Sequence, residues 1–442
     1  MTPSAYDFFL KERQRVPSWI TAFLPSSDAP PAPSEIVDRL SSLPLVETRT
    51  PEDPEIAESE WEVEADFRFE REGPLTRARL WAAPSDYFET AHADWLGITK
   101  ADQAAAKESR FYVGVSTTFG DNPLRDFHRQ VRILEAAAPD AVMVMDLAAC
   151  RPHPPGWLKE VSSSSVPPSP QNLYVIHSVY EKDDPRAAVW MHTHGLRRCG
   201  SIELEIMGVT SAQAPPLARL INTVAAMFVE QGPCPPDTPF EGGRRLNLVW
   251  LPWEDGIRRV KKPSLGGQDD RDPAHSLPSG ILFVPRWGLF GRRYASPARH
   301  VPTLEANPLL YVSRMETDRM ALLAQDRLGE FADLQRRFGS SPDWVFLVKL
   351  GYPIDGAASE GDREHLWFQV HGIRGNAVDA TLTNEPYGVA RLKKGDRGTH
   401  PLDLLSDWAV LNPSGQYTPD TLHLLRRKIA ASPAPDGPDA PS

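Results

Sequence analysis

Long hydrophobic runs and cysteines are scarce in this sequence of 442 residues. No apolar run approaches the roughly 20 residues that a membrane-spanning helix needs. The three cysteines, Cys150, Cys199 and Cys234, are odd in number and far apart, which argues against a disulfide framework and indicates a reducing compartment. The first residues lack a basic region followed by an apolar core, so we expect no secretory signal. These absences predict a cytoplasmic protein.

The motifs of several well-known enzyme classes are also missing. The chain has no HExxH and no CxxC, no G-x-S-x-G elbow, no P-loop, and no G-x-G-x-x-G after a predicted strand. A nucleotide-dependent enzyme is therefore disfavoured. A formal net charge of −11 argues against nucleic acid and against a membrane as the main partner. The acidic surface suits a basic protein partner, and the sequence does not indicate an oligomeric state.

The length and the 41% of hydrophobic residues are those of a globular protein with more than one domain. The order of predicted strands and helices favours the α+β class. We predict four regions: a small N-terminal α+β unit at 1–103, a central α/β sandwich with a mixed sheet at 104–302, a long helix with a C-terminal β domain at 303–430, and a disordered tail at 431–442.

Periodicity places the main elements of these regions. Strict alternation of apolar and polar residues predicts a strand over 61–69, and apolar residues at helical spacing predict a helix over 123–137. One amphipathic helix is predicted over 316–338. Short strands with Gly-rich turns follow it, including one at 387–392, and they predict a small antiparallel β-barrel or a strongly bent sheet.

The segment 190–206 holds the densest group of chemically capable side chains. Its pattern predicts a strand, a Gly-bounded turn and a returning strand. Residues two apart on a strand share a face, so His192 and His194 point the same way, as do Glu203 and Glu205. This hairpin is the primary candidate site.

Two interpretations of the hairpin remain open. His192 and His194 could ligate zinc or another divalent metal, with Cys199, Glu203 or Glu205 completing the site, as in a hydrolase with three protein ligands and an activated water. Alternatively, the histidines and glutamates form cross-strand pairs on the exposed face of an ordinary hairpin that binds no cofactor. Cys199 follows two arginines, which also makes it a candidate nucleophile.

A secondary group of candidates lies in the C-terminal region. Glu364 with His365, and Asn384 with Glu385, stand at predicted strand ends, where ligand-binding loops are common. The alternative is turn chemistry, because asparagine and aspartate side chains bond to nearby backbone in tight turns.

Two stretches resemble known bacterial families. Residues 343–419, with Glu364-His365-Leu366-Trp367, Thr383-Asn384-Glu385-Pro386 and Leu392-Lys393-Lys394-Gly395-Asp396, are similar to the YegJ-like domain of unknown function 2314. The 190–205 segment resembles the central motif of the domain of unknown function 4026, which implies that family for the N-terminal and central regions. Neither resemblance implies an activity. We therefore expect a non-enzymatic interaction protein, regulatory or immunity-like, with a metal-dependent hydrolase using His192 and His194 as the alternative.

Overall fold

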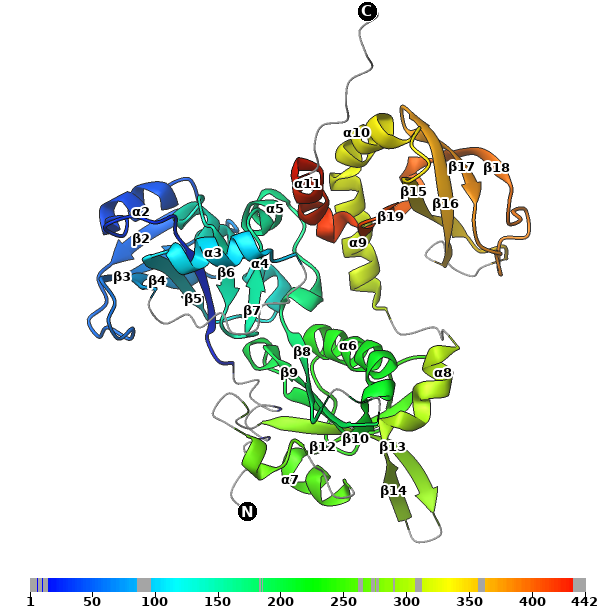
Figure 1. The fold of residues 1–442 in the computed structure, drawn as a ribbon, viewed down its shortest axis with the longest axis horizontal. Helices are drawn as coiled ribbons and strands as arrows, with labels where there is room; N and C mark the ends of the chain where they lie inside the picture. The colour runs from blue at the N-terminus through cyan, green and yellow to red at the C-terminus, as the bar shows by residue number, and fades with distance from the viewer. Residues whose placement is uncertain are drawn as a thin grey trace, which may run out of the picture. The chain divides into compact units, whose positions relative to one another are not determined.

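A computed structural model of the chain describes residues 6, 10, 15–85, 97–182, 184, 186–260, 265–271, 275, 278–288, 291–306, 312–356 and 362–431. The chain forms two compact units (Figure 1), unit 1 with Met1–Ser162 and Ser169–Ser313, and unit 2 with Ser163–Pro168 and Arg314–Ser442. The α+β class is confirmed, because the chain forms helices and three sheets among the described residues, two in unit 1 and one in unit 2. Of the predicted disordered tail, all but Ala431 lies outside the described residues. No helix in the described ranges is long and apolar enough to cross a membrane.

The first sheet of unit 1 has seven strands in the order β2-β3-β4-β5-β1-β6-β7. The strands are β1 (Ser18–Phe23), β2 (Leu45–Arg49), β3 (Trp61–Phe67), β4 (Thr76–Pro84), β5 (Phe111–Thr117), β6 (Met143–Asp146) and β7 (Arg151–His153). Helices α2 (Pro33–Leu40), α3 (Lys100–Glu108), α4 (Pro123–Ala137) and α5 (Trp157–Ser163) accompany them. The predicted 123–137 helix has the bounds of α4, because Pro123 starts it and the side chain of Asn122 accepts the N–H of Arg125.

The second sheet of unit 1 carries the predicted hairpin, and its order is β11-β12-β13-β10-β9-β8. The strands are β8 (Val175–Tyr180), β9 (Ala188–His194), β10 (Glu203–Thr210), β11 (Phe240–Glu241), β12 (Asn247–Pro252), β13 (Ser279–Gly288) and β14 (Gly291–Ala295), which pairs with β13. Strands β10 and β13 are parallel and the other pairs antiparallel, so the predicted mixed sheet is confirmed. Helices α6 (Ala214–Gln231), α7 (Trp253–Gly256) and α8 (Val301–Glu305) complete this part.

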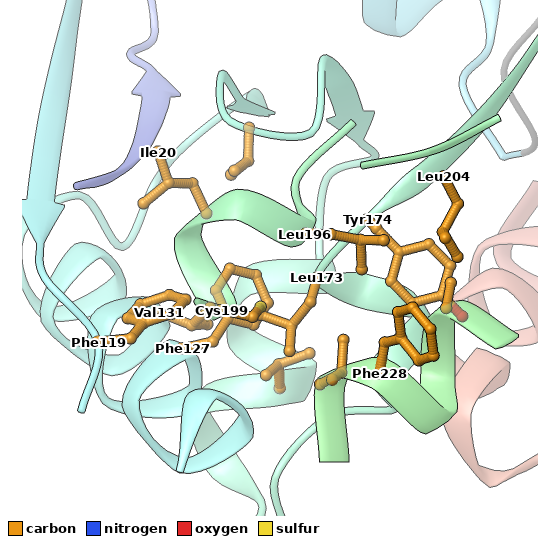
Figure 2. Close-up of a cluster of buried hydrophobic side chains, with 14 of the residues drawn as sticks. Ile20, Phe119, Phe127, Val131, Leu173, Tyr174, Leu196, Cys199, Leu204 and Phe228 are labelled. Carbon is orange, nitrogen blue, oxygen red and sulfur yellow. The ribbon is translucent and has the colours of Figure 1, made fainter. Parts of the chain in front are cut away.

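One continuous hydrophobic core joins the two sheets of unit 1 (Figure 2). Leucines and aromatic residues from α4, α6, β10 and the turn after β9 meet there, among them Phe127, Leu196, Leu204 and Phe228. A fully buried ion pair crosses the same region: the Arg198 guanidinium donates to both Asp146 carboxylate oxygens at 2.9 and 2.7 Å. Because an unpaired buried charge is costly, this pair fixes the turn after β9 against the end of β6.

Unit 2 contains an open antiparallel sheet of six strands in the order β18-β17-β16-β15-β19-β20. They are β15 (Val345–Pro353), β16 (Arg363–Arg374), β17 (Ala377–Leu382), β18 (Arg397–Pro401), β19 (Leu405–Asn412) and β20 (Gly415–Tyr417), with helices α9 (Arg314–Asp326), α10 (Leu328–Phe338) and α11 (Leu422–Ala431). The edge strands β18 and β20 do not pair with each other in the described ranges, so the predicted barrel is not closed.

Two further predictions for unit 2 are wrong. The long 316–338 helix is interrupted at Arg327, whose backbone leaves the helical region (φ −104°, ψ 11°) and whose side chain donates to the Pro419 carbonyl at 2.6 Å. The 387–392 strand does not form. The N–H groups of Tyr387 and Gly388 are bound by the Glu364 carboxylate at 2.7 Å each, which leaves them no sheet partner.

Candidate metal centre

The candidate site is built on β9, which lies between β8 and β10. Its side chains alternate: Met191 is buried in the core that contains α6, while Trp190 belongs to a smaller cluster on the opposite face. His192 and His194 share the face of Trp190, as the two-residue period of a strand requires. The sequence-based prediction that the two imidazoles point the same way is consistent with their ring centroids, which are 4.9 Å apart.

A third histidine joins this pair from β8. His177 stands directly opposite His192 in the β8–β9 register. Its ring centroid is 5.6 Å from that of His192 and 4.8 Å from that of His194. One nitrogen from each of the three imidazoles lies within 4.8 Å of the others, which is a spacing that a single metal ion can draw together.

Burial keeps the His192 imidazole neutral. Its side chain is only 3% exposed, and desolvation, with the neighbouring His194, His275 and His177, lowers its pKa to about 2. An unprotonated imidazole is the form that binds metals. Its Nδ1 atom is buried and has no hydrogen-bond partner among the described residues.

A fourth histidine reaches the group from outside the sheet. His275 lies in the segment between α7 and β13, and its Nε2 atom is 3.2 Å from Nε2 of His192. Its ring centroid is 5.1 Å from that of His194 and 4.9 Å from that of Trp190. His275 therefore lies beside His192 and His194, while the group of three histidines with mutually close nitrogens is His177, His192 and His194.

Glu205 supports this arrangement from β10, where it pairs with His192 in the register. Its carboxylate is 1% exposed and accepts hydrogen bonds from Trp190 Nε1 at 2.9 Å, Ser279 Oγ at 2.6 Å and Arg271 at 2.9 Å. The His–Glu cross-strand pair predicted from the sequence exists, but its face is buried rather than exposed. Both carboxylate oxygens of Glu205 already accept hydrogen bonds, so Glu205 holds the surrounding side chains in place.

Glu203 is placed differently. Its carboxylate accepts the Thr193 hydroxyl at 2.6 Å and the N–H groups of Gly195 and Arg197 at 3.0 and 3.2 Å, so it fixes the turn that follows His194. Burial raises its pKa to about 7, although these hydrogen bonds partly oppose the shift. Glu203 and His194 both line a pocket of about 170 Å³, together with Arg197.

Cys199 does not join the histidines. Its side chain is 7% exposed and lies in the core of unit 1 among residues such as Phe127 and Leu173 (Figure 2). Burial raises the pKa of its thiol to about 12, despite the neighbouring Arg198. The thiolate that a nucleophile or a metal ligand needs is therefore disfavoured at neutral pH.

The secondary candidates in unit 2 mainly fix loops. The Glu364 carboxylate binds the backbone near Tyr387, and Asn384 Oδ1 accepts the Trp367 N–H at 2.8 Å. His365 Nδ1 lies 2.8 Å from Ser406 Oγ, and burial lowers its pKa. Glu385 is exposed. The contacts of Glu364, His365 and Asn384 join residues far apart in the sequence, so they fix loops and strand ends against one another rather than forming tight turns.

The candidate residues from the sequence include His192 and His194 but not three residues that lie near them, His177, His275 and Arg271. His177 has no short spacing to the His-Thr-His motif, and only the β8–β9 pairing brings it opposite His192. His275 and Arg271 come from the chain between α7 and β13, and no short motif in the sequence marks them.

Comparison with protein families gives three matches. Residues 18–168 match "Protein of unknown function (DUF4026) N-terminal", and residues 176–283 match "Protein of unknown function (DUF4026) C-terminal". Residues 330–434 match "Uncharacterized protein conserved in bacteria (DUF2314)". No curated protein and no solved structure matches the chain.

All four histidines lie in the second of these regions. The two DUF4026 regions together cover more than half of the chain. The resemblance drawn from the sequence motifs is thereby confirmed. The chain belongs to the DUF4026 family and carries a DUF2314 domain in its C-terminal part.

Proposed function

We propose that this chain binds one divalent transition-metal ion, zinc in the first place, through His177, His192 and His194. The observation that carries the proposal is the approach of three imidazole nitrogens to within 4.8 Å of one another. Imidazole nitrogen suits zinc, copper and nickel far better than magnesium or calcium, which prefer oxygen ligands. A buried, neutral His192 supports the same assignment, because only an unprotonated imidazole binds a metal.

Elemental analysis of the full chain, purified without a histidine tag, tests this proposal. We expect about one equivalent of metal per chain, as purified or after addition and removal of excess zinc, as for a mononuclear site. The double variant His192→Ala/His194→Ala should lose that equivalent. His371→Ala, which removes an exposed histidine of unit 2, is the matched control and should keep it. A folded wild-type chain that retains no zinc, copper or nickel would overturn the proposal.

A metal-dependent hydrolase is the second candidate function. The observation that favours it is the pocket shared by His194 and Glu203, because a carboxyl group with a pKa of about 7 suits a general base. Zinc-dependent turnover of a nitrophenyl ester or phosphodiester that is lost in Glu203→Gln, with the metal retained, would support it. Absence of zinc-dependent turnover across both substrate types would count against it.

A non-enzymatic interaction role, which the sequence predicts, is compatible with a bound metal. Its support is the exposed acidic loop before β3, where Glu52, Asp53, Glu55, Glu58 and Glu60 all face solvent. Such a loop offers a surface to a basic protein partner.

A further inference from the structure

The position of His275 bears on the class of metal site, and the inference drawn from it rests on the proposed function. With Zn–N bonds of 2.0–2.1 Å, two nitrogens on one tetrahedral ion lie about 3.3–3.4 Å apart. The Nε2 atoms of His192 and His275 are 3.2 Å apart, which is also the distance of a hydrogen bond between the two rings. The two imidazoles therefore already have the separation of two ligands on one ion.

Arg271 links His275 to the site. The Arg271 guanidinium donates to the His275 carbonyl at 2.8 Å, to Ser279 Oγ at 3.0 Å and to the buried Glu205 carboxylate at 2.9 Å. It also lies over the Trp253 ring, 4.7 Å from its centroid. These contacts hold His275 over the sheet, so its approach to His192 has its own supporting structure.

We infer that His275 is the fourth ligand and that it closes the coordination sphere of the bound ion. Zinc sites with four protein ligands are structural, whereas catalytic sites keep a position for water. The site thus takes a borderline ion such as Zn²⁺ or Co²⁺ on four neutral imidazoles, without a thiolate or a carboxylate. A closed site of this kind stabilises one conformation of the chain, or binds the ion only in that conformation. It leaves no open coordination position for the activated water of a hydrolase.

Cobalt substitution of the full chain tests the inference, because Co²⁺ reports coordination by its visible spectrum. We expect the wild-type Co²⁺ chain to show a tetrahedral spectrum that azide does not change. His275→Ala should still bind Co²⁺, with affinity reduced about tenfold or more, and azide should then alter its spectrum. His371→Ala is the control and should behave as wild type.

A second variant guards against misfolding of the first. His275→Cys should add a thiolate-to-cobalt charge-transfer band, which appears only if residue 275 is bound to the ion. An azide response in the wild-type chain, or a His275→Cys spectrum without the new band, would overturn the fourth-ligand assignment. Failure of the wild-type chain to bind Co²⁺ at all would instead overturn the proposed function, so the two failures are distinguishable.

Discussion

His192 differs from two other buried histidines of unit 1, His128 and His300, in what it contacts. His128 Nε2 lies 3.0 Å from the Val161 carbonyl, and His300 Nε2 lies 3.1 Å from the Asn247 carbonyl. Those contacts are the usual way in which a buried imidazole is satisfied. His192 instead contacts another imidazole nitrogen, and its Nδ1 has no hydrogen-bond partner among the described residues. The contact of His192 with a second imidazole at 3.2 Å is the feature that fits an ion site.

Asp407 gives a pH-dependent prediction at the residue scale. It is 7% exposed, and burial raises its pKa from 3.8 to about 6, although the N–H of Trp408 donates to it at 2.8 Å. Because the folded pKa is the higher one, the folded state binds more protons between about pH 4 and 6, and stability falls as pH rises through that window. Asp407→Asn should therefore stabilise unit 2 by roughly 1–3 kcal/mol at pH 8.

Denaturant unfolding of both proteins at several pH values measures this effect. The stability difference between wild type and Asp407→Asn should shrink to near zero as the pH falls to about 4. Asp318→Asn, at an exposed position in α9, is the control and should show a small difference at every pH. A difference for Asp407→Asn that stays constant from pH 4 to 8 would contradict the prediction.

At the scale of elements, the turn between β9 and β10 sets the position of His194. Gly195 has a φ of 112°, and a Cβ at this position would lie 2.3 Å from the Leu173 carbonyl oxygen. Gly195→Ala should destabilise unit 1 by more than the roughly 1–2 kcal/mol that a left-handed conformation alone costs. It should also weaken metal binding, because the turn cannot move without moving His194. Denaturant unfolding and zinc titration measure the two effects.

Gly375→Ala is the matched control for this turn. Gly375 also has a positive φ, of 56°, but a Cβ there would meet nothing within 4 Å. Gly375→Ala should lose only the stability that the left-handed backbone conformation costs an alanine, roughly 1–2 kcal/mol, and its zinc affinity should be unchanged. Equal losses of stability in the two variants would show that the close approach to Leu173 has no effect.

The helices and strands show which sequence patterns were sufficient to predict an element. Alternation and apolar runs predicted β3, β9 and β10 because each of these strands buries its apolar residues against a core. The helical periodicity over 316–338 continues through the break at Arg327, since Leu323 and Phe331 are both buried on either side of it. Periodicity reports burial on one face, so it does not detect such a break.

The candidate metal site was only partly predictable for a related reason. The His-Thr-His motif is local, so the strand period alone places His192 and His194 on one face. His177 and His275 join them through strand pairing and through the Arg271–Glu205 ion pair. These are long-range contacts, and a single sequence carries no direct signal for them.

For the whole molecule, the location of the site predicts where metal binding stabilises the chain. The histidines lie in unit 1, whereas unit 2 has a separate hydrophobic core that includes Phe368 and Trp408. Zinc at 100 times its dissociation constant should stabilise the folded unit 1 by about 2.7 kcal/mol. Hydrogen exchange of β8, β9 and β10 should therefore slow on addition of zinc, while β16 and β19 are not expected to change.

A chelator should reverse this protection, and His192→Ala/His194→Ala should show none. Protection that arises equally in both units, or that persists in the double variant, would point to zinc bound elsewhere on the surface.

The buried Arg198–Asp146 ion pair also limits which parts of the chain can be separated from each other during evolution. Asp146 belongs to the region that matches the N-terminal DUF4026 domain, and Arg198 belongs to the region that matches the C-terminal one. A recombination event that separated the two regions would leave one charge without its counter-ion in each product. Selection against such products would keep the two regions together through descent. The DUF2314 region contributes neither charge, so this constraint leaves it free to be exchanged between lineages.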